Sequence, residues 1–291
     1  MSEPIKNNSE IVEIFRHLIR DQLGLLGLII VVLIIGSAIF APLIAPYDPI
    51  AMNIPDRIQG PSFAHILGTD QLGRDTFSRV IYGGRVALQV ALPTIAGALF
   101  LGLLLGMIAG YGPKWLDNLI LLFFDTVRSF PTVMFALAVV ALVGPSLNTV
   151  IMVIMATSIP TYGRVVRTMT QSIKTSEFIT AERSLGASTV RIMGVHILPN
   201  VLGPLAVLAA MDIPTIVGLE AGLSFLGMGV KPPTPSWGSL LNDGYSLLRN
   251  TPWLIIAGGI PLILITLGFT FLGEALRDVV DPKLRGRGGS K

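Results

Sequence analysis

The sequence has no cysteine and only three histidines, and charged residues make up 13% of its 291 positions. The absence of cysteine excludes a disulfide framework and a thiolate metal site. The histidines, His17, His65 and His196, are far apart in the sequence, so we predict no metal centre. The share of charged residues is about half that of a typical soluble chain, while 52% of the residues are hydrophobic. This composition predicts a protein embedded in lipid.

Long hydrophobic runs account for the low charge. A helix needs about 20 apolar residues to cross a bilayer core of about 30 Å. Three stretches of at least this length contain no Asp, Glu, Lys or Arg: residues 22–47, 86–113 and 250–273. They predict three transmembrane helices.

Further spans follow from less regular stretches. Residues 129–163 are uncharged, but a turn-forming cluster at 144–148 divides them. This division predicts a third span at about 118–143 and a fourth at about 149–164, and another span follows at about 200–223. We therefore predict an all-α polytopic membrane protein with about six transmembrane helices.

The basic residues indicate how the chain is oriented. The net charge is +3, but the 21 Lys and Arg residues form no single stripe that would suit nucleic acid. Most of them fall in segments on one side of the predicted spans, and the positive-inside rule predicts that this side is cytoplasmic. The resulting order is a cytoplasmic tail (1–22), a first transmembrane helix (23–45), an extracytoplasmic loop (46–85), a five-helix core (86–276) and a cytoplasmic tail (277–291).

One long polar segment within the core, residues 168–199, is predicted to be helical and cytoplasmic. Phe178, Ala181 and Leu185 follow the spacing of a single helix face. Gly186 should interrupt this helix, and Ser188 is placed to cap a second helix that leads into the fifth span. We predict a short helix, a turn and a return to the membrane.

Three sequence blocks resemble known permeases. Residues 180–188 and 197–200 resemble the cytoplasmic loop signature of ABC importer permeases, with Ala181, Gly186, Leu198 and Pro199 at matching positions. Residues 67–79 and 220–238 look like the peptide and nickel branch of that family. The resemblance covers about residues 20–288 and implies the type I ABC importer permease fold.

The resemblance implies that the cytoplasmic segment is a coupling helix held in a cleft of an ATP-hydrolysing subunit. The alternative is an interfacial helix lying on membrane lipid headgroups, but Glu177 and Glu182 do not suit an anionic surface. The residues assigned to docking are Glu177, Ala181, Glu182, Leu185, Gly186, Ala187, Ser188, Arg191, Leu198 and Pro199.

Charges inside apolar spans are costly and each needs a reason. Asp125 and Arg128 are three residues apart, and we expect them to pair on one helix face. Asp212 should lie near the middle of the membrane and Glu220 close to its outer end. They are candidates for the translocation pathway or, equally, for hydrogen bonds that fix helix packing.

The predicted outer loop carries Arg74, Asp75 and Arg79, which are candidate contacts for an external binding protein. A role in packing the loop is as well supported. The spacing of Phe77, Val80, Ile81 and Leu88 predicts a helix lying on the outer face before the second span.

The sequence lacks a Gly-x-x-x-x-Gly-Lys-Ser/Thr loop, so any ATP must be used by other chains. The resemblance implies a pore-forming subunit and not an enzyme, with no bound cofactor of its own and with ATP and Mg on partner subunits. The implied partners are a homologous permease subunit in a heterodimer, two ATP-binding subunits and an extracytoplasmic solute-binding protein, in the cytoplasmic membrane.

The implied cargo is short peptides. Nickel complexes or glutathione fit the same motifs, and these residues do not choose among them. Two other classes stay open at this point: a proton-coupled secondary transporter, in which Asp212 and Glu220 would carry protons, and a membrane enzyme, for which His196 is the only support.

Overall fold

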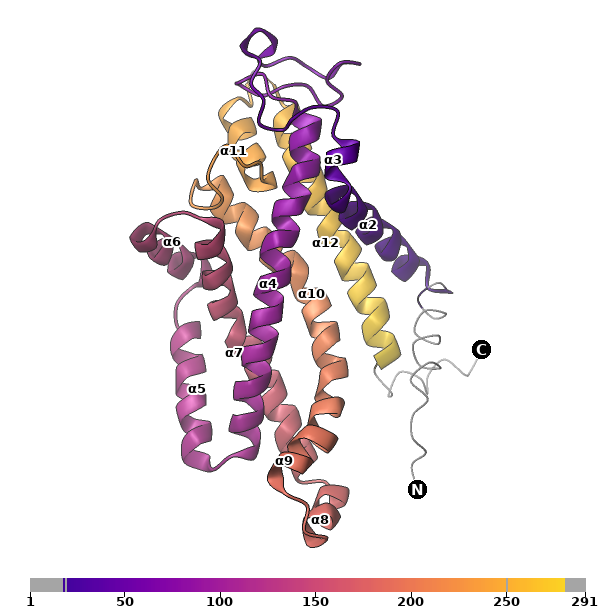
Figure 1. Ribbon diagram of the computed structural model, residues 1–291, viewed down its shortest axis with the longest axis vertical. Coiled ribbons are helices and arrows are strands. Elements are labelled where there is room, and N and C mark those ends of the chain that lie inside the picture. Colours follow the sequence, from indigo (N-terminus) through magenta and orange to yellow (C-terminus); the bar gives the residue numbers. More distant parts are fainter. Residues whose placement is uncertain (1–17, 19, 250, 281–291) are drawn as a thin grey trace.

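A computed structural model describes residue 18, residues 20–249 and residues 251–280. These residues form helices and loops, with one isolated β-bridge between Thr69 and Asp75. Figure 1 shows an elongated bundle with the loop after α3 at one end and α8 at the other. We call these the loop end and the hairpin end. The predicted tails lie largely outside the described residues.

The helices follow one another along the bundle, and five of them are long and apolar enough to cross a membrane, or six if the bent pair α5 and α6 counts as one span. This agrees with the six predicted spans, and the all-α class is confirmed. The elements are α2 (Gln22–Ile39), α3 (Ala41–Ile44), η1 (Ile54–Asp56), α4 (Thr76–Tyr111), α5 (Lys114–Arg128), α6 (Thr132–Val143), α7 (Leu147–Lys174), α8 (Glu177–Ser184), α9 (Thr189–Arg191), the π-helical segment η2 (Ile192–Ile197), α10 (Leu198–Phe225), α11 (Trp237–Ser246) and α12 (Trp253–Val280).

The third span differs from the prediction of one helix over 118–143. It is two helices, α5 and α6, bent by 82°. The break falls at Pro131, whose ring and missing N–H oppose a continuing helix and whose presence disfavours helical backbone at Phe130. The Ser129 hydroxyl donates to the Asp125 carbonyl at 2.7 Å, which satisfies one backbone group at the end of α5. Figure 1 shows α6 turning away from the line of α5.

The second and fourth spans are longer than predicted. Instead of a separate helix on the outer face, the structure has one continuous helix, α4, that begins ten residues before the predicted span. The Asp75 carboxylate caps it by accepting from the Ser78 N–H at 2.8 Å. At the hairpin end α7 continues to Lys174, so the first residues of the predicted cytoplasmic segment belong to this span.

Small residues bring α4 and α7 together. Gly102, Gly106 and Gly110 are four residues apart and lie on one face of α4. A Cβ at Gly102 would lie 2.6 Å from the Tyr162 Cβ, and one at Gly110 would lie 2.6 Å from the Thr170 Cβ. Such contacts are too short for any side chain, so glycine is required. Repeats of small residues at this spacing are typical of closely packed membrane helices.

Candidate functional site

A helical hairpin projects from the hairpin end of the bundle. It consists of α8, a turn at Gly186 and α9, which continues through η2 into α10 (Figure 1). Gly186 has φ +87°, a backbone conformation that other residues adopt only with strain. The Ser188 hydroxyl accepts from the Arg191 N–H at 3.3 Å and caps α9. The predicted short helix, turn and second helix are confirmed.

The apolar face of this hairpin is largely exposed in the described part of the chain. Leu185 and Val190 are 84% and 81% exposed, and Phe178 is 48% exposed. Only Ile179 turns inward and is fully buried. Most of the residues assigned to docking lie on this hairpin, whereas Leu198 and Pro199 lie farther along, at the start of α10. An exposed apolar patch on a short protruding element is typical of a protein contact surface.

Contacts with three long helices hold the hairpin in place. Tyr111, at the end of α4, accepts from the Lys174 ammonium at its carbonyl, 2.7 Å away. Its hydroxyl accepts from Arg183 on α8 at 3.2 Å, and both cations lie over its ring. On the other side, the His196 ring packs edge-on against Phe178. The hairpin is therefore tied to α4, α7 and the helix leading into α10. The sequence interpretation did not identify Tyr111.

The charges along α5 pair with α7 and not with each other. The prediction of an Asp125–Arg128 pair is wrong: Asp125 pairs with Arg164, and Arg128 donates to the Thr161 hydroxyl at 3.1 Å. One turn closer to the hairpin, Arg167 holds Asp117 through two hydrogen bonds, one of 2.7 Å. The helices α5 and α7 are adjacent and antiparallel, so a charge on α5 can pair with an opposite charge on α7. This contact between helices replaces the pair that was expected between two residues three apart on α5.

A cavity of about 430 Å³ opens beside the break between α5 and α6. Its wall is formed by the ends of these two helices together with α7 and α10. The polar side chains that line it are Arg128, Ser129, Thr132, Thr157, Ser158, Thr161, Asp212 and Thr215. Non-helical backbone is tolerated at membrane depth only inside protein or beside a watery cavity, which is where the break lies.

The two candidate pathway acids differ in their surroundings. Asp212 lines the cavity and accepts from the Tyr162 hydroxyl at 2.8 Å. Glu220 is 1% exposed, is not among the residues that line this cavity, and accepts from the Ser224 hydroxyl at 2.6 Å. The surroundings of Glu220 suit the packing alternative, whereas those of Asp212 suit a surface reached by a solute.

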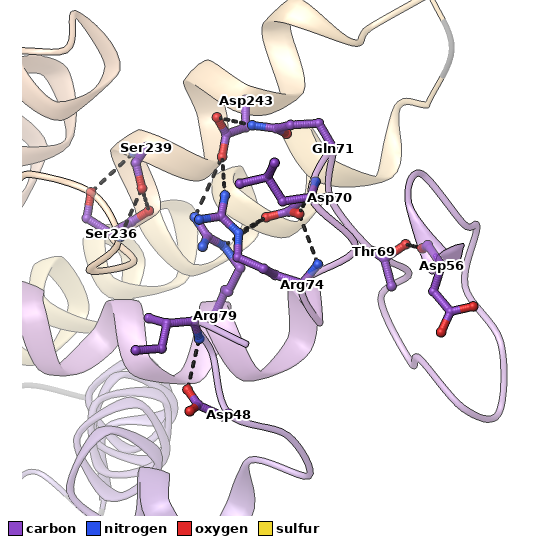
Figure 2. Close-up of polar contacts among 12 residues, drawn as sticks. Asp48, Asp56, Thr69, Asp70, Gln71, Arg74, Arg79, Ser236, Ser239 and Asp243 are labelled. Atoms are coloured by element: carbon purple, nitrogen blue, oxygen red, sulfur yellow. Dashed lines mark hydrogen bonds and ion pairs between the residues drawn. The ribbon is translucent and has the colours of Figure 1, made fainter. Parts of the chain in front are cut away.

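At the loop end, an ion cluster fixes the loop before α4. Arg74 and Asp70 form an ion pair of 2.6 Å, and Arg79 lies 3.5 Å from the same carboxylate. Asp243 on α11 lies 3.7 Å from Arg74 and 3.6 Å from Arg79. Figure 2 shows both guanidinium groups between the two carboxylates. Beside this cluster, the Trp237 ring N–H donates to the Val80 carbonyl at 2.9 Å and joins α11 to α4.

The side chains of Arg74, Asp75 and Arg79 therefore face inward. They are 5%, 3% and 2% exposed, and Asp75 also lies 2.9 Å from the His65 ring. This burial argues against direct contact with a binding protein and favours the packing alternative for all three. The sequence showed the charges but not the partner that the two arginines share, Asp243, which lies far along the chain. Within the described residues, no group of three or more His, Asp or Glu side chains is placed to hold a metal.

A bundle of helices able to span a membrane, with a hairpin at one end and a loop held by ion pairs at the other, defines a polytopic membrane protein. A family described as binding-protein-dependent transport system inner membrane component matches residues 102–286. The N-terminal membrane domain of oligopeptide transport permease C matches residues 9–61. The chain belongs to the family of binding-protein-dependent inner membrane permeases.

Several relatives match almost end to end. A dipeptide transport system permease protein of Alkalihalophilus pseudofirmus is 41% identical, with 94% of this chain and 90% of the relative covered. A di/tripeptide permease protein of Pseudomonas aeruginosa is 35% identical, with 95% and 93% covered. A glutathione permease protein of Pectobacterium atrosepticum is 36% identical, with 94% and 91% covered.

The fold has a counterpart among solved structures. A chain of a methionine ABC transporter, solved in an inward-facing conformation, covers 70% of this chain with a TM-score of 0.56 at 17% identity; 97% of that chain is covered. This supports the type I permease fold alone. Together with family membership, it makes the chain a pore subunit of the inner membrane and not an enzyme. The secondary-transporter and membrane-enzyme alternatives are not favoured.

Proposed function

We propose that this chain forms half of the pore of an ABC importer for short peptides. It pairs with a homologous permease subunit in a heterodimer. Two ATP-binding subunits, which carry ATP and Mg, dock beneath this pair, and one of them binds the hairpin of this chain. An extracytoplasmic solute-binding protein delivers the cargo at the loop end. Family membership already implies ATPase and binding-protein partners in general; their number and identity belong to this proposal.

The exposed hairpin is the observation that carries the proposal. Leu185 and Val190 present an apolar patch at the tip, while Tyr111 and His196 tie its base to the long helices. A tip held this firmly passes the movement of a docked subunit to α10, because α9, η2 and α10 are one uninterrupted helix of 37 residues. A loosely tethered loop would absorb that movement.

The orientation follows from charge. Lys114, Lys174, Arg183 and Arg191 lie at the hairpin end, and the positive-inside rule favours this end as cytoplasmic. Both termini then lie in the cytoplasm. The loop end faces outward, where its ion cluster gives the binding protein a firm surface even though its own charges are buried.

The cargo class rests on relatives. Two of the relatives named above are described as carrying dipeptides or di/tripeptides and one as carrying glutathione, which is itself a tripeptide-like molecule. Short peptides are the class common to these names. Transport of glutathione or nickel complexes by the same architecture is the second candidate.

A matched pair of leucine substitutions tests the docking surface. Leu185→Asp places a charge in the exposed patch, and we expect it to abolish co-purification of the ATP-binding subunits in detergent while the permease pair stays intact. Leu248→Asp introduces the same change at an exposed leucine near the loop end, and it should leave the complex whole. Equal recovery of the ATP-binding subunits with both variants would contradict the proposal.

A further inference from the structure

The cavity at the break of the third span holds two opposite charges that do not pair with each other. Among the described residues, neither Arg128 nor Asp212 forms a salt bridge. Each is held instead by a neutral group on α7: Arg128 donates to the Thr161 hydroxyl at 3.1 Å, and Asp212 accepts from the Tyr162 hydroxyl at 2.8 Å. Thr161 and Tyr162 are consecutive, so both charges are positioned by one turn of the same helix.

Charges within membrane spans are expensive, and where they persist they mark pathways or pair with one another. The nearby charges on α5 and α7 follow the pairing rule, since Asp125 is matched by Arg164 and Asp117 by Arg167. Arg128 and Asp212 depart from it. A guanidinium has five N–H donors and a carboxylate accepts several hydrogen bonds, so each has capacity left for a ligand.

The ligand that matches this pattern carries one positive and one negative group a short distance apart. Resting on the peptide-importer function proposed above, we propose that the cavity is a binding site for short peptides on their way through the membrane. Arg128 binds the C-terminal carboxylate, and Asp212 binds the N-terminal ammonium.

Physical chemistry supports each half of this assignment. Arginine recognises a carboxylate through two parallel hydrogen bonds, and a carboxylate accepts charge-assisted hydrogen bonds from an ammonium. The cavity volume of about 430 Å³ falls within the range of small-molecule sites. An extended dipeptide spans about 7 Å. The hydroxyls of Ser129, Thr157 and Thr215 line the same space and can bond a peptide backbone whatever its side chains.

Such a site binds the two charged termini that every unblocked peptide carries. It distinguishes free termini from blocked ones and tolerates different side chains, which suits a pore that serves many sequences. It would also bind weakly, because a site on a transport path must release its ligand.

The test uses the purified complex of permeases and ATP-binding subunits without the binding protein, so that the selectivity of that protein does not enter. Binding of radiolabelled dialanine is measured by equilibrium dialysis, with N-acetyl-dialanine and dialanine amide as competitors. In the wild type, we expect each blocked peptide to compete about tenfold less well than unlabelled dialanine. Asp212→Asn should lower the affinity for dialanine about tenfold and leave that for N-acetyl-dialanine unchanged. Arg128→Gln should lower the affinity for dialanine about tenfold and leave that for dialanine amide unchanged.

Two controls remove the same kinds of charge from the neighbouring helices α5 and α7, outside the cavity. Asp125→Asn and Arg164→Gln should weaken the three peptides equally or not at all. Asp212→Glu and Arg128→Lys keep the charge and should keep the preference for free termini. They distinguish binding lost through the missing charge from binding lost because a variant fails to assemble.

Failure of this inference is distinguishable from failure of the proposed function. If Asp212→Asn and Arg128→Gln reduce the binding of all three peptides equally, or change none, the terminus site is overturned. The proposed function still stands in that case if the reconstituted wild-type importer takes up dialanine. If the wild type neither binds nor imports any peptide, the peptide function itself falls.

Discussion

At the scale of single residues, the partners of charged side chains decide what each charge does. Arg74 and Arg79 look like surface charges in the sequence, yet each is nearly buried between Asp70 and Asp243. Asp212, an isolated acid in an apolar span, is the one that meets a cavity. Burial and pairing, not residue type, separate structural charges from those open to a solute.

The ion cluster predicts a large cost for neutralising Asp70. Its side chain is fully buried and accepts from the Leu72 N–H at 2.8 Å, the Arg74 N–H at 3.0 Å and the Arg74 side chain. Asp70→Asn leaves two guanidinium groups short of a countercharge, and breaking a buried pair in this way costs about 3–5 kcal/mol. We expect a clearly lower thermal transition in detergent, measured by tryptophan fluorescence. Asp48→Asn, at an exposed loop acid, should change it little, and equal effects would mean that the cluster is not stabilising.

At the scale of helices, the breaks between helices and the close contacts of helices position the two candidate sites. The bend between α5 and α6 creates the cavity wall, and the turn at Gly186 creates the hairpin. The glycine face of α4 brings α7 close, and α7 in turn positions Thr161 and Tyr162 beside the cavity. The arrangement of α7 therefore links the packing of the bundle to both candidate sites.

Two glycines with positive φ allow an effect on coupling to be distinguished from an effect on stability. Gly186 has φ +87° and Gly144 has φ +97°, and at both positions a Cβ would meet nothing within 4 Å. Alanine at Gly186 costs about 1–2 kcal/mol through its positive φ. Alanine at Gly144 should cost at least as much, because φ +97° with ψ 151° is a backbone conformation that glycine almost alone adopts. We expect Gly186→Ala to reduce peptide-stimulated ATP hydrolysis and Gly144→Ala to leave it near the wild-type rate. Gly186→Pro should abolish peptide-stimulated ATP hydrolysis, because proline cannot adopt positive φ. Membrane insertion should stay intact. Unchanged peptide-stimulated ATP hydrolysis in Gly186→Pro would contradict the proposal that the hairpin passes movement to α10.

The contact between α4 and α7 predicts a second contrast between glycines. At Gly106, a Cβ would lie 2.7 Å from the Val166 Cβ, whereas at Gly36 on α2 it would meet nothing within 4 Å. Gly106→Ala should destabilise the bundle by about 1–3 kcal/mol through overpacking. Gly36→Ala should be neutral or slightly stabilising. Size-exclusion profiles after graded heating measure the difference, and equal profiles would show that α4 and α7 separate at little cost.

At the scale of the whole molecule, the two ends of the bundle differ in kind. The hairpin end presents an exposed apolar tip on tied helices, whereas the loop end is held together by buried ion pairs. This asymmetry suits an importer that binds ATP-binding subunits on one side and a solute-binding protein on the other. The pore itself requires a second permease chain.

The absence of cysteine makes the orientation directly measurable. Val190→Cys places a single thiol at the hairpin tip, and Ala64→Cys places one on an exposed loop position. With both termini cytoplasmic, a membrane-impermeant maleimide applied to intact spheroplasts should label Ala64→Cys and spare Val190→Cys. Inside-out vesicles freed of the ATP-binding subunits, which would otherwise cover the hairpin tip, should give the reverse pattern. Labelling of the hairpin from outside would overturn the orientation and the docking proposal together.

The sequence by itself determined the features that depend on neighbouring residues. Uncharged runs of about 20 residues specify membrane spans because lipid excludes charge and unpaired backbone groups. Gly186 and Ser188 specify a turn and a cap because these effects act over a few positions, and the three blocks were enough to indicate the family. The hairpin residues were therefore predictable.

Only the tertiary structure decided which distant groups meet. Asp125 pairs with Arg164, and Arg74 shares Asp243 with Arg79. These partners lie too far apart in the sequence for local residue spacing to predict the contacts. The cavity needs the ends of α5 and α6 beside α7 and α10, and Asp212 lines it only because these helices pack as they do. Helix packing sets these contacts, and packing depends on the shapes of many side chains at once.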